Sequence, residues 1–353
     1  MNSSKIDNVL ILYTELSQYT VECLNALTKV NQNLKVHVVK WPINNEAPFV
    51  FEFDERIIVV EKSEIDLNNY ANKISPKVIL CSGWVDKDYI KLIKSFKTNV
   101  IKVLAFDNYW ENSVKQNIGR IFLKKIISKH FNYCWVPGQL HITYANKIGF
   151  KTDQVITGFY ARDLDSFNRK FKSSIDLKKN FPKKFLYVGR YLKLKGVLDL
   201  WNSFIEFSKN NKDWELHCVG TGDLFDKRVI HEKIIHHGFL QKDELLNLTE
   251  ITGVFIMPSH YDHWGMAVQE FAASGFPLIC SDKVGAASSF LKENENGVLF
   301  VSKNQKSLLN AMRKISNLSD EDLSKFGRNS NILAKKYDIN NWVNSFMKFL
   351  KYD

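Results

Sequence analysis

Short apolar runs rich in β-branched residues alternate with amphipathic stretches along this 353-residue chain. In the first half the runs predict strands over Val9–Tyr13, Lys35–Trp41, Arg56–Glu61, Lys77–Ser82, Val100–Phe106 and Tyr133–Val136. In the second half they predict strands over Lys184–Val188, Trp214–Val219, Lys233–His236, Gly253–Met257 and Pro277–Ser281. Helical patterns fall between them, at Thr20–Lys29, Val114–His130, Gly196–Lys209, Lys242–Thr249, Gly265–Ser274 and Gln305–Ile315. Continuous apolar strands separated by helices predict parallel sheets covered on both faces.

The same rhythm occurs twice, so we expect an α/β protein of two Rossmann-like, doubly wound domains that face each other across a cleft. A length of 353 residues is long for one domain and comfortable for two. The polar, lysine-rich stretch Arg162–Lys183 lacks clear periodicity and is predicted to be a linker. The first domain is therefore placed at residues 1–165 and the second at residues 166–337. Ligands of such sheets bind at the carboxyl ends of the strands.

Charge and cysteine content narrow the class of protein. The net charge is +11, from 49 Lys and Arg against 38 Asp and Glu, which favours an anionic partner or else a solvated lysine surface. The five cysteines are far apart and form no C-x-x-C pair, as expected of buried thiols in a reducing compartment. No run is long enough for a signal peptide core or a membrane span, so we expect a cytoplasmic protein, soluble or peripheral at the inner face of the plasma membrane.

The first segment with chemical content is FLYVGRYLKLKG, Phe185–Gly196. A strand is predicted to end at Gly189, Arg190 and Lys195 follow in the loop, and a helix is expected to begin near Gly196. Two cations beside a helix N-terminus can clamp a diphosphate, because the free N–H groups and the helix dipole also attract anions. The alternative is a basic loop that is merely solvated.

A second glycine pair, Gly220 and Gly222, follows the next predicted strand. This G-x-G lacks the third glycine of the dinucleotide fingerprint, and such a pair more often marks a tight strand–helix turn. The chain contains no P-loop sequence.

The most informative segment is MPSHYDHWGMAVQEFAASGFPLICS, Met257–Ser281. A buried strand is expected to deliver a short polar loop with Asp262, and Gly265 opens a helix that carries Glu270. Both carboxylates can then face one cleft and hydrogen-bond the hydroxyls of two sugar rings. Alternatively, Glu270 is an ordinary helix-surface residue and Asp262 caps a helix.

Taken in order, V-G-R…K-G, V-G-x-G, H-G-F-L and P-S-x-x-D-x-x-G-x-x-x-x-E-x-x-A-x-G-x-P resemble the motifs of the retaining glycosyltransferases of family 4, of the bacterial group 1 type, which have the GT-B fold. The similarity covers Phe185–Phe300, and only the strand–helix rhythm is similar before that. It implies a nucleotide-diphosphate sugar donor of the UDP or GDP type, with no metal and no other cofactor. It also implies that the last helix, residues 338–353, packs back on the first domain.

The resemblance assigns roles to individual residues. Arg190 and Lys195 match the cations that bind the donor diphosphate. Glu270 matches the glutamate that holds the ribose, and Asp262 falls where another glutamate contacts the transferred sugar. Gly238 and Phe239 match the segment near the base. The remaining implied donor-binding residues are Gly189, Gly220, His263, Trp264, Gly265, Met266 and Ala267.

Three departures from the family pattern bear on these roles. Asp262 is one methylene shorter than the usual glutamate, which leaves the identity of the sugar open. The loop Tyr13–Thr20 has no glycine, and Gly285 is followed by Ala286 where a second glycine is common.

In the first half, Asp107 follows a predicted strand where the family commonly has a histidine. It is a candidate to orient the acceptor hydroxyl or act as a base, and the alternative is a turn residue at the strand end.

Two other patterns suggest metal binding and are set aside. Four histidines, at 236, 237, 260 and 263, match no ordinary zinc spacing, so hydrogen-bonding or core roles are favoured. The D-x-D triplets at 86/88, 163/165 and 320/322 are expected on helix surfaces or in the linker, and are treated as chance.

The segment Lys115–Phe131 interleaves Ile118, Ile121, Phe122, Ile126 and Ile127 with four cations, Arg120, Lys124, Lys125 and Lys129. Such a helix can lie on an anionic membrane surface. It can equally pack one side on the core and expose the lysines. No nucleic-acid-binding motif is present.

The sequence thus predicts a retaining, hexosyl-type glycosyltransferase (EC 2.4 class) that acts on a glycan or lipid-linked glycan acceptor in cell-surface polysaccharide or lipopolysaccharide biosynthesis. The alternatives are a nucleotide-sugar epimerase or phosphorylase of the same fold, or a non-catalytic nucleotide-sugar-binding scaffold.

Overall fold

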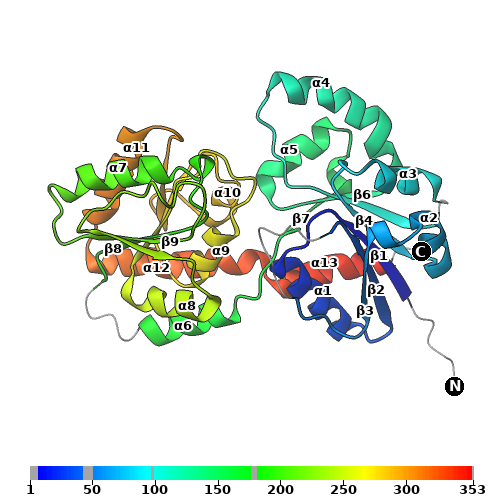
Figure 1. Cartoon of the computed structure of the whole chain (residues 1–353), viewed down its shortest axis with the longest axis horizontal. Helices are drawn as coiled ribbons and strands as arrows, with labels where there is room; N and C mark the ends of the chain where they lie inside the picture. The colour runs from blue at the N-terminus through cyan, green and yellow to red at the C-terminus, as the bar shows by residue number, and fades with distance from the viewer. Residues whose placement is uncertain (1–6, 43–50, 97–98, 176–180, 352–353) are drawn as a thin grey trace. The chain divides into compact units, whose positions relative to one another are not determined.

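Each half of the chain folds around one parallel sheet with helices on both faces (Figure 1). The computed structural model describes residues 7–42, 51–96, 99–175 and 181–351. Two units result: unit 1 comprises Met1–Asp163 and Tyr337–Asp353, and unit 2 comprises Leu164–Lys336. In the described part of the chain, no helix has the length and apolarity to cross a bilayer.

The sheet of unit 1 has the strand order β3-β2-β1-β4-β5-β6-β7. The strands are β1 Asp7–Tyr13, β2 Leu34–Lys40, β3 Ile57–Glu61, β4 Val78–Ser82, β5 Ile101–Ala105, β6 Tyr133–Val136 and β7 Val155–Thr157. The helices are α1 Gln18–Val30, α2 Leu67–Ile74, α3 Lys87–Ser95, α4 Val114–Phe122, α5 Gln139–Lys147 and α13 Ile339–Lys351. The order reverses direction at β1, which pairs with both β2 and β4. Such a switch point is where doubly wound sheets bind ligands.

The sheet of unit 2 has the order β10-β9-β8-β11-β12-β13. The strands are β8 Lys184–Val188, β9 Glu215–Val219, β10 Ile234–Gly238, β11 Val254–Met257, β12 Leu278–Ser281 and β13 Gly297–Phe300. The helices are α6 Asp165–Ile175, α7 Val197–Ser208, α8 Lys242–Ile251, α9 Met266–Ala273, α10 Ala287–Phe290, α11 Gln305–Ser316 and α12 Asp320–Ala334. Here the switch point lies at β8, between β9 and β11.

Burial on both faces explains why the strands are continuously apolar. In β1, Val9 and Ile11 belong to one core cluster, whereas Leu10 and Leu12 belong to another. Successive side chains of a strand point to opposite faces, so each face of this sheet has its own core.

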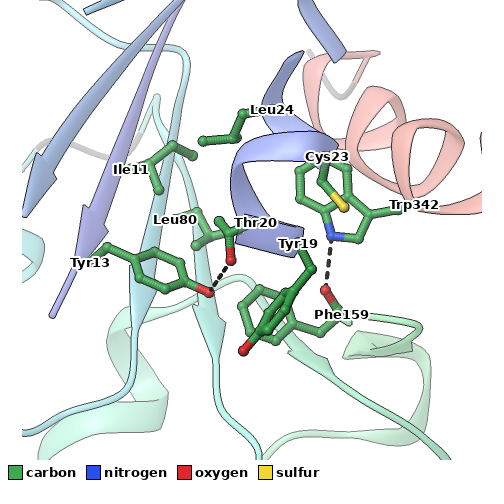
Figure 2. A pocket seen from close by; sticks show the side chains of 9 residues that line it. All are labelled: Ile11, Tyr13, Tyr19, Thr20, Cys23, Leu24, Leu80, Phe159 and Trp342. Atoms are coloured by element: carbon green, nitrogen blue, oxygen red, sulfur yellow. Dashed lines mark hydrogen bonds between the residues drawn. The ribbon is translucent and has the colours of Figure 1, made fainter. Parts of the chain in front are cut away.

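The last helix, α13, completes the core of unit 1. It contacts α1, and its Trp342, Phe346 and Phe349 are buried with the strand residues of that unit. The Trp342 ring lies 4.9 Å from that of Trp135, and its Nε1 donates a hydrogen bond of 2.8 Å to the Phe159 carbonyl (Figure 2). The Trp342 ring is therefore packed in the core, and its N–H group has a hydrogen-bond acceptor.

Several sequence predictions need correction, and the first concerns the predicted linker. The segment Arg162–Lys183 is not simply a linker, because α6 occupies Asp165–Ile175 and Phe167 is buried. Its aromatic residues four apart form one apolar face that packs on α8 and α9, a pattern masked by the surrounding lysines. Residues 176–180 of the predicted linker lie outside the described residues. Strands β7 and β13 were not predicted: no residue of β7 is buried, and Leu299 of β13 is exposed, so neither forms a continuous buried run.

The predicted helix Val114–His130 is also interrupted. It continues from α4 as one π-helical turn, Leu123–Ile127, and then a 3-10 turn, Ser128–His130. Asp86 differs from its predicted place on a helix surface: it is a buried cap whose carboxylate accepts the amide N–H groups of Asp88 and Tyr89 at the start of α3.

Two imidazoles join β9 and β10 in unit 2. His217 Nδ1 and His237 Nε2 are 3.0 Å apart, and the two rings stack. Desolvation is the largest cause that lowers the pKa of each below the ordinary 6.5. The folded state therefore keeps both rings neutral at a pH where the unfolded chain takes up protons.

We predict that the Trp342→Ala variant lowers the unfolding free energy of unit 1 by about 3–5 kcal/mol, the usual cost of removing a buried indole. Chemical denaturation followed by tryptophan fluorescence measures this loss. The matched control is Asn344→Ala on the exposed face of α13. Equal stability of the two variants would contradict the assigned packing.

Acidification is predicted to destabilise unit 2. Because the folded pKa values of His217 and His237 lie below 6.5, their contribution to stability is complete above that pH and is lost as the pH falls from 6.5 through these lower folded pKa values. Thermal melting across a pH series should show this decline, and the decline should be shallower in the His217→Gln variant. A wild-type melting temperature that stays constant on acidification below 6.5 is the opposing result.

Candidate functional site

The loops that leave the carboxyl ends of β8, β9 and β11 gather most of the predicted site residues in unit 2. After β8, the Gly189 amide donates to the Val219 carbonyl at 3.0 Å, which ties the two strand ends together. The chain then passes the exposed Arg190 and makes a 3-10 turn, Lys193–Lys195, before α7 begins at Val197. The predicted strand Lys184–Val188 and the start of a helix near Gly196 are thus confirmed.

Glycine is required at two points of these loops. Gly196 has a left-handed backbone with φ of 69°, and a Cβ there would lie 2.1 Å from the Pro258 carbonyl oxygen. A Cβ on Gly220 would lie 2.0 Å from the Gly189 carbonyl oxygen. Any larger residue would force these backbones apart. The glycines therefore permit the close packing of the loops.

Lys195 and Asp262, predicted from separate motifs, form an ion pair. Lys195 Nζ lies 2.6 Å from Asp262 Oδ2, and the two side chains are 20% and 12% exposed. The Asp262 backbone is fixed as well, since its amide donates to the Lys283 carbonyl and its carbonyl accepts from Gly285. The ammonium group is thus held at the carboxyl edge of the sheet by a carboxylate from a rigid loop.

Two helix N-termini begin in the same group of loops. The caps of α7 and α9 are Gly196 and Gly265, both left-handed, and neither helix has a side-chain cap bond. A helix N-terminus without a side-chain cap keeps N–H groups for an anion. Together with the adjacent cations, these termini can neutralise a diphosphate.

The remaining predicted residues occupy the same loops and the first turns of α9. Trp264 is buried, whereas Glu270, Met266 and Ala267 of α9 are half-buried. Gly238 is the last residue of β10, and the next residue, Phe239, is exposed. Asp107 belongs to unit 1, where it follows β5 and accepts a 3.0 Å hydrogen bond from the Tyr160 hydroxyl.

The four candidate histidines have hydrogen-bond partners within unit 2. His260 Nε2 lies 2.7 Å from Asp199 Oδ2, and His263 Nδ1 lies 3.3 Å from the Tyr261 hydroxyl. His236 Nδ1 lies 2.9 Å from the Tyr191 hydroxyl. Among the residues that the structure describes, no group of three His, Cys, Asp or Glu side chains is placed to hold a metal ion.

Sequence reasoning missed two features. Asp199, in the first turn of α7, pairs with His260 and joins that helix to the Asp262 loop. In unit 1, a cavity of about 630 Å³ opens at the carboxyl ends of β1, β2, β4 and β5. Its lining includes Asp107, Glu15 and Trp41. The sequence could have indicated this cavity through position, because Asp107, Glu15 and Trp41 each lie one or two residues beyond the end of a strand.

Comparison with known proteins agrees with this geometry. Residues 168–332 match the family of glycosyl transferases group 1. An uncharacterized glycosyltransferase of Methanocaldococcus jannaschii is 27% identical over 49% of the chain and 45% of its own length. The alpha-monoglucosyldiacylglycerol synthase of Acholeplasma laidlawii is 24% identical over 70% of the chain and 61% of its own length. The chain thus matches less than two thirds of the length of these relatives.

Solved structures match the fold across nearly the whole chain. A glycosyltransferase from Rickettsia africae gives a TM-score of 0.76 at 16% identity, covering 98% of this chain and 99% of that one. The Anabaena protein HepE in complex with UDP and glucose gives a TM-score of 0.72 at 12% identity, covering 98% and 99%. The match over residues 168–332 identifies this segment of unit 2 with the group 1 glycosyl transferases, and the architecture of both units is the GT-B fold.

Proposed function

We propose that the protein is a retaining glycosyltransferase that moves a hexose-type sugar from a nucleotide-diphosphate donor, UDP or GDP, to a glycan or lipid-linked glycan. The observation that carries this proposal is the meeting of Lys195 and Asp262 beside the N-terminus of α7 in unit 2. A cation and an uncapped helix terminus suit a diphosphate, and a neighbouring carboxylate suits sugar hydroxyls. The structure of HepE with UDP and glucose is consistent with such ligands in this fold.

In the proposed mechanism, the positive groups stabilise the departing nucleotide. As the bond between the anomeric carbon and the diphosphate oxygen breaks, negative charge grows on that diphosphate. Arg190, Lys195 and the free N–H groups of α7 would bind this charge, a form of electrostatic catalysis. The carboxylate of Glu270 would accept hydrogen bonds from the ribose hydroxyls. The exposed Phe239 would lie against the base.

The ion pair gives Asp262 a second part in the proposed mechanism. A carboxylate 2.6 Å from Lys195 Nζ restrains the lysine before the donor arrives, so less side-chain entropy is lost on binding. Asp262 would then hydrogen-bond the sugar through its remaining acceptor capacity.

In unit 1, we assign Asp107 to the acceptor. Its carboxylate would orient the acceptor hydroxyl or take up its proton. The bond from the Tyr160 hydroxyl fixes one carboxylate oxygen, which leaves the other for substrate.

Thermal shift tests the donor site. A saturating nucleotide sugar should raise the melting temperature, since binding at 100 times Kd stabilises a protein by about 2.7 kcal/mol. The response should disappear in Glu270→Ala and Arg190→Ala and persist in Lys212→Ala, an exposed cation of unit 2. If no UDP or GDP sugar stabilises the wild type, the proposal fails.

Product analysis separates the rival functions. Conversion of the free nucleotide sugar without acceptor identifies an epimerase, and release of a sugar phosphate with inorganic phosphate identifies a phosphorylase. Binding without transfer or hydrolysis identifies a scaffold.

We further propose that α4 of unit 1 docks on an anionic membrane at the inner face of the plasma membrane, where lipid-linked glycans for surface polysaccharide or lipopolysaccharide are assembled. None of the nine residues of α4 is buried. Val114, Ile118 and Phe122 recur four apart on one face, and the latter two are 57% and 60% exposed. Lys124 and Lys125 lie exposed beside this face, as anionic lipids require. Ile127, by contrast, is buried in the core.

We predict that the protein sediments with vesicles of phosphatidylcholine and phosphatidylglycerol, but not with phosphatidylcholine alone. The double variant Ile118→Asp, Phe122→Asp should lose this binding because it removes the apolar anchor. Reversing Lys124 and Lys125 to Glu should weaken it at least tenfold, since each cation contributes about 1 kcal/mol at such a surface. The control is Ile332→Asp, an equally exposed apolar residue of α12. Equal binding by the double variant and the control would exclude α4 as the docking face.

A further inference from the structure

The cavity of unit 1 combines a fixed aromatic ring with carboxylates. It lies at the carboxyl ends of four parallel strands, and its volume of about 630 Å³ falls within the range of small-molecule sites. Tyr13 ends β1, Lys40 ends β2, and Asp107 follows β5. The position and size indicate a ligand site in unit 1.

Trp41 is held in place by a buried acid. Its Nε1 donates a 2.7 Å hydrogen bond to Asp86 Oδ2, and Lys62 Nζ lies 2.7 Å from the same oxygen. Asp86 is in turn fixed as the cap of α3. Yet Trp41 remains 38% exposed and lines the cavity. An indole that is fixed at its edge and still partly exposed offers a rigid apolar surface to a ligand ring.

The charged residues that line the cavity are Glu15, Asp107 and Lys40. The ammonium of Lys40 lies 2.9 Å from the carboxylate of Glu61, which is not among the lining residues, so the charge of this lysine is compensated from outside the lining. Burial raises the pKa of Tyr13, Tyr19 and Tyr160, so these phenols stay neutral. In the view of Figure 2 the Tyr13 and Tyr19 rings lie below the apolar side chains of Ile11, Leu24 and Leu80. Two carboxylates without an uncompensated cation disfavour a phosphate group.

A lipid tail would also be a poor occupant. Besides the carboxylates, the hydroxyl-bearing residues Thr14, Ser17 and Ser82 line the cavity. Covering these groups with hydrocarbon would remove water from them without replacing their hydrogen bonds, which costs free energy for each group. A sugar ring, by contrast, offers hydroxyls around its edge and C–H groups on its faces.

We propose that this cavity binds an uncharged sugar unit of the acceptor, with its ring stacked on Trp41 and its hydroxyls donating to Glu15 and Asp107. The inference rests on the proposed function, for which it names the chemical class of the acceptor end that enters unit 1. It makes Trp41 and Glu15 determinants of specificity, and Asp86 a positioning residue that acts through Trp41.

Fluorine NMR of the full chain labelled with fluorotryptophan tests the inference. The Trp41 and Trp264 resonances are assigned by their loss in Trp41→Phe and Trp264→Phe. Neutral methyl glycosides of glucose, galactose, mannose and N-acetylglucosamine are titrated to tens of millimolar, and a hexose phosphate is titrated in parallel. We expect at least one neutral glycoside to shift the Trp41 resonance, and the hexose phosphate to bind at least tenfold more weakly.

Two variants sharpen the test. Asp107→Asn should weaken glycoside binding at least tenfold, since a hydrogen bond to a charged group contributes about 1.5–3 kcal/mol. Glu61→Gln keeps a partner for Lys40 but removes the compensating charge, so binding of the hexose phosphate should improve several-fold.

The outcomes separate the two proposals. If no neutral glycoside shifts the Trp41 resonance, or if the hexose phosphate binds the wild type more tightly, the inference is overturned. A Trp264 resonance that still responds to a nucleotide sugar then leaves the donor assignment intact. If Trp264 responds to no nucleotide sugar, it is the proposed function that fails.

Discussion

Close approach of backbones at the carboxyl edge of unit 2 is the constraint on which its site depends. The strand ends and loops come so near each other that a single added carbon at Gly196 or Gly220 would lie about an ångström inside ordinary contact distance of a carbonyl oxygen. Because those oxygens belong to neighbouring backbone, no side-chain adjustment relieves the collision. This packing brings the end of the first loop onto Pro258, next to the strand that leads to Asp262. The ion pair between Lys195 and Asp262, and its place beside the start of α7, follow from this packing.

Most of the fold could be predicted from the sequence because burial on both faces leaves an unmistakable pattern. The predicted ends of strands such as Lys184–Val188 and Tyr133–Val136 are the ends that the structure has, because residues that interrupt a strand flank an apolar run. The failures share one physical cause. In α6 the apolar face consists of two phenylalanines among lysines, and in β13, Gly297–Phe300, a glycine and the exposed Leu299 interrupt the apolar run. Tertiary packing rather than local pattern decides such segments.

The site was less fully predictable, because a sequence orders residues but does not orient them. Their positions after strands and near glycines were enough to predict that Arg190, Lys195 and Asp262 lie at the carboxyl edge of one sheet. It was not enough to pair Lys195 with Asp262, since that contact depends on the fold of two loops 67 residues apart. In unit 1 the aromatic platform at Trp41 depends on Asp86, 45 residues away. Long-range pairs of this kind leave no local signal in a single sequence.

The return of α13 to unit 1 has a consequence for how the molecule is made. A ribosome completes all of unit 2 before it reaches Ile339, the first residue of α13. Until then, the surfaces that receive Trp342, Phe346 and Phe349 stay uncovered on the first unit. Until α13 is made, unit 1 is an unfinished intermediate with exposed apolar surface, although most of its residues are synthesised first. The part of its core that α13 contributes is therefore the last to form.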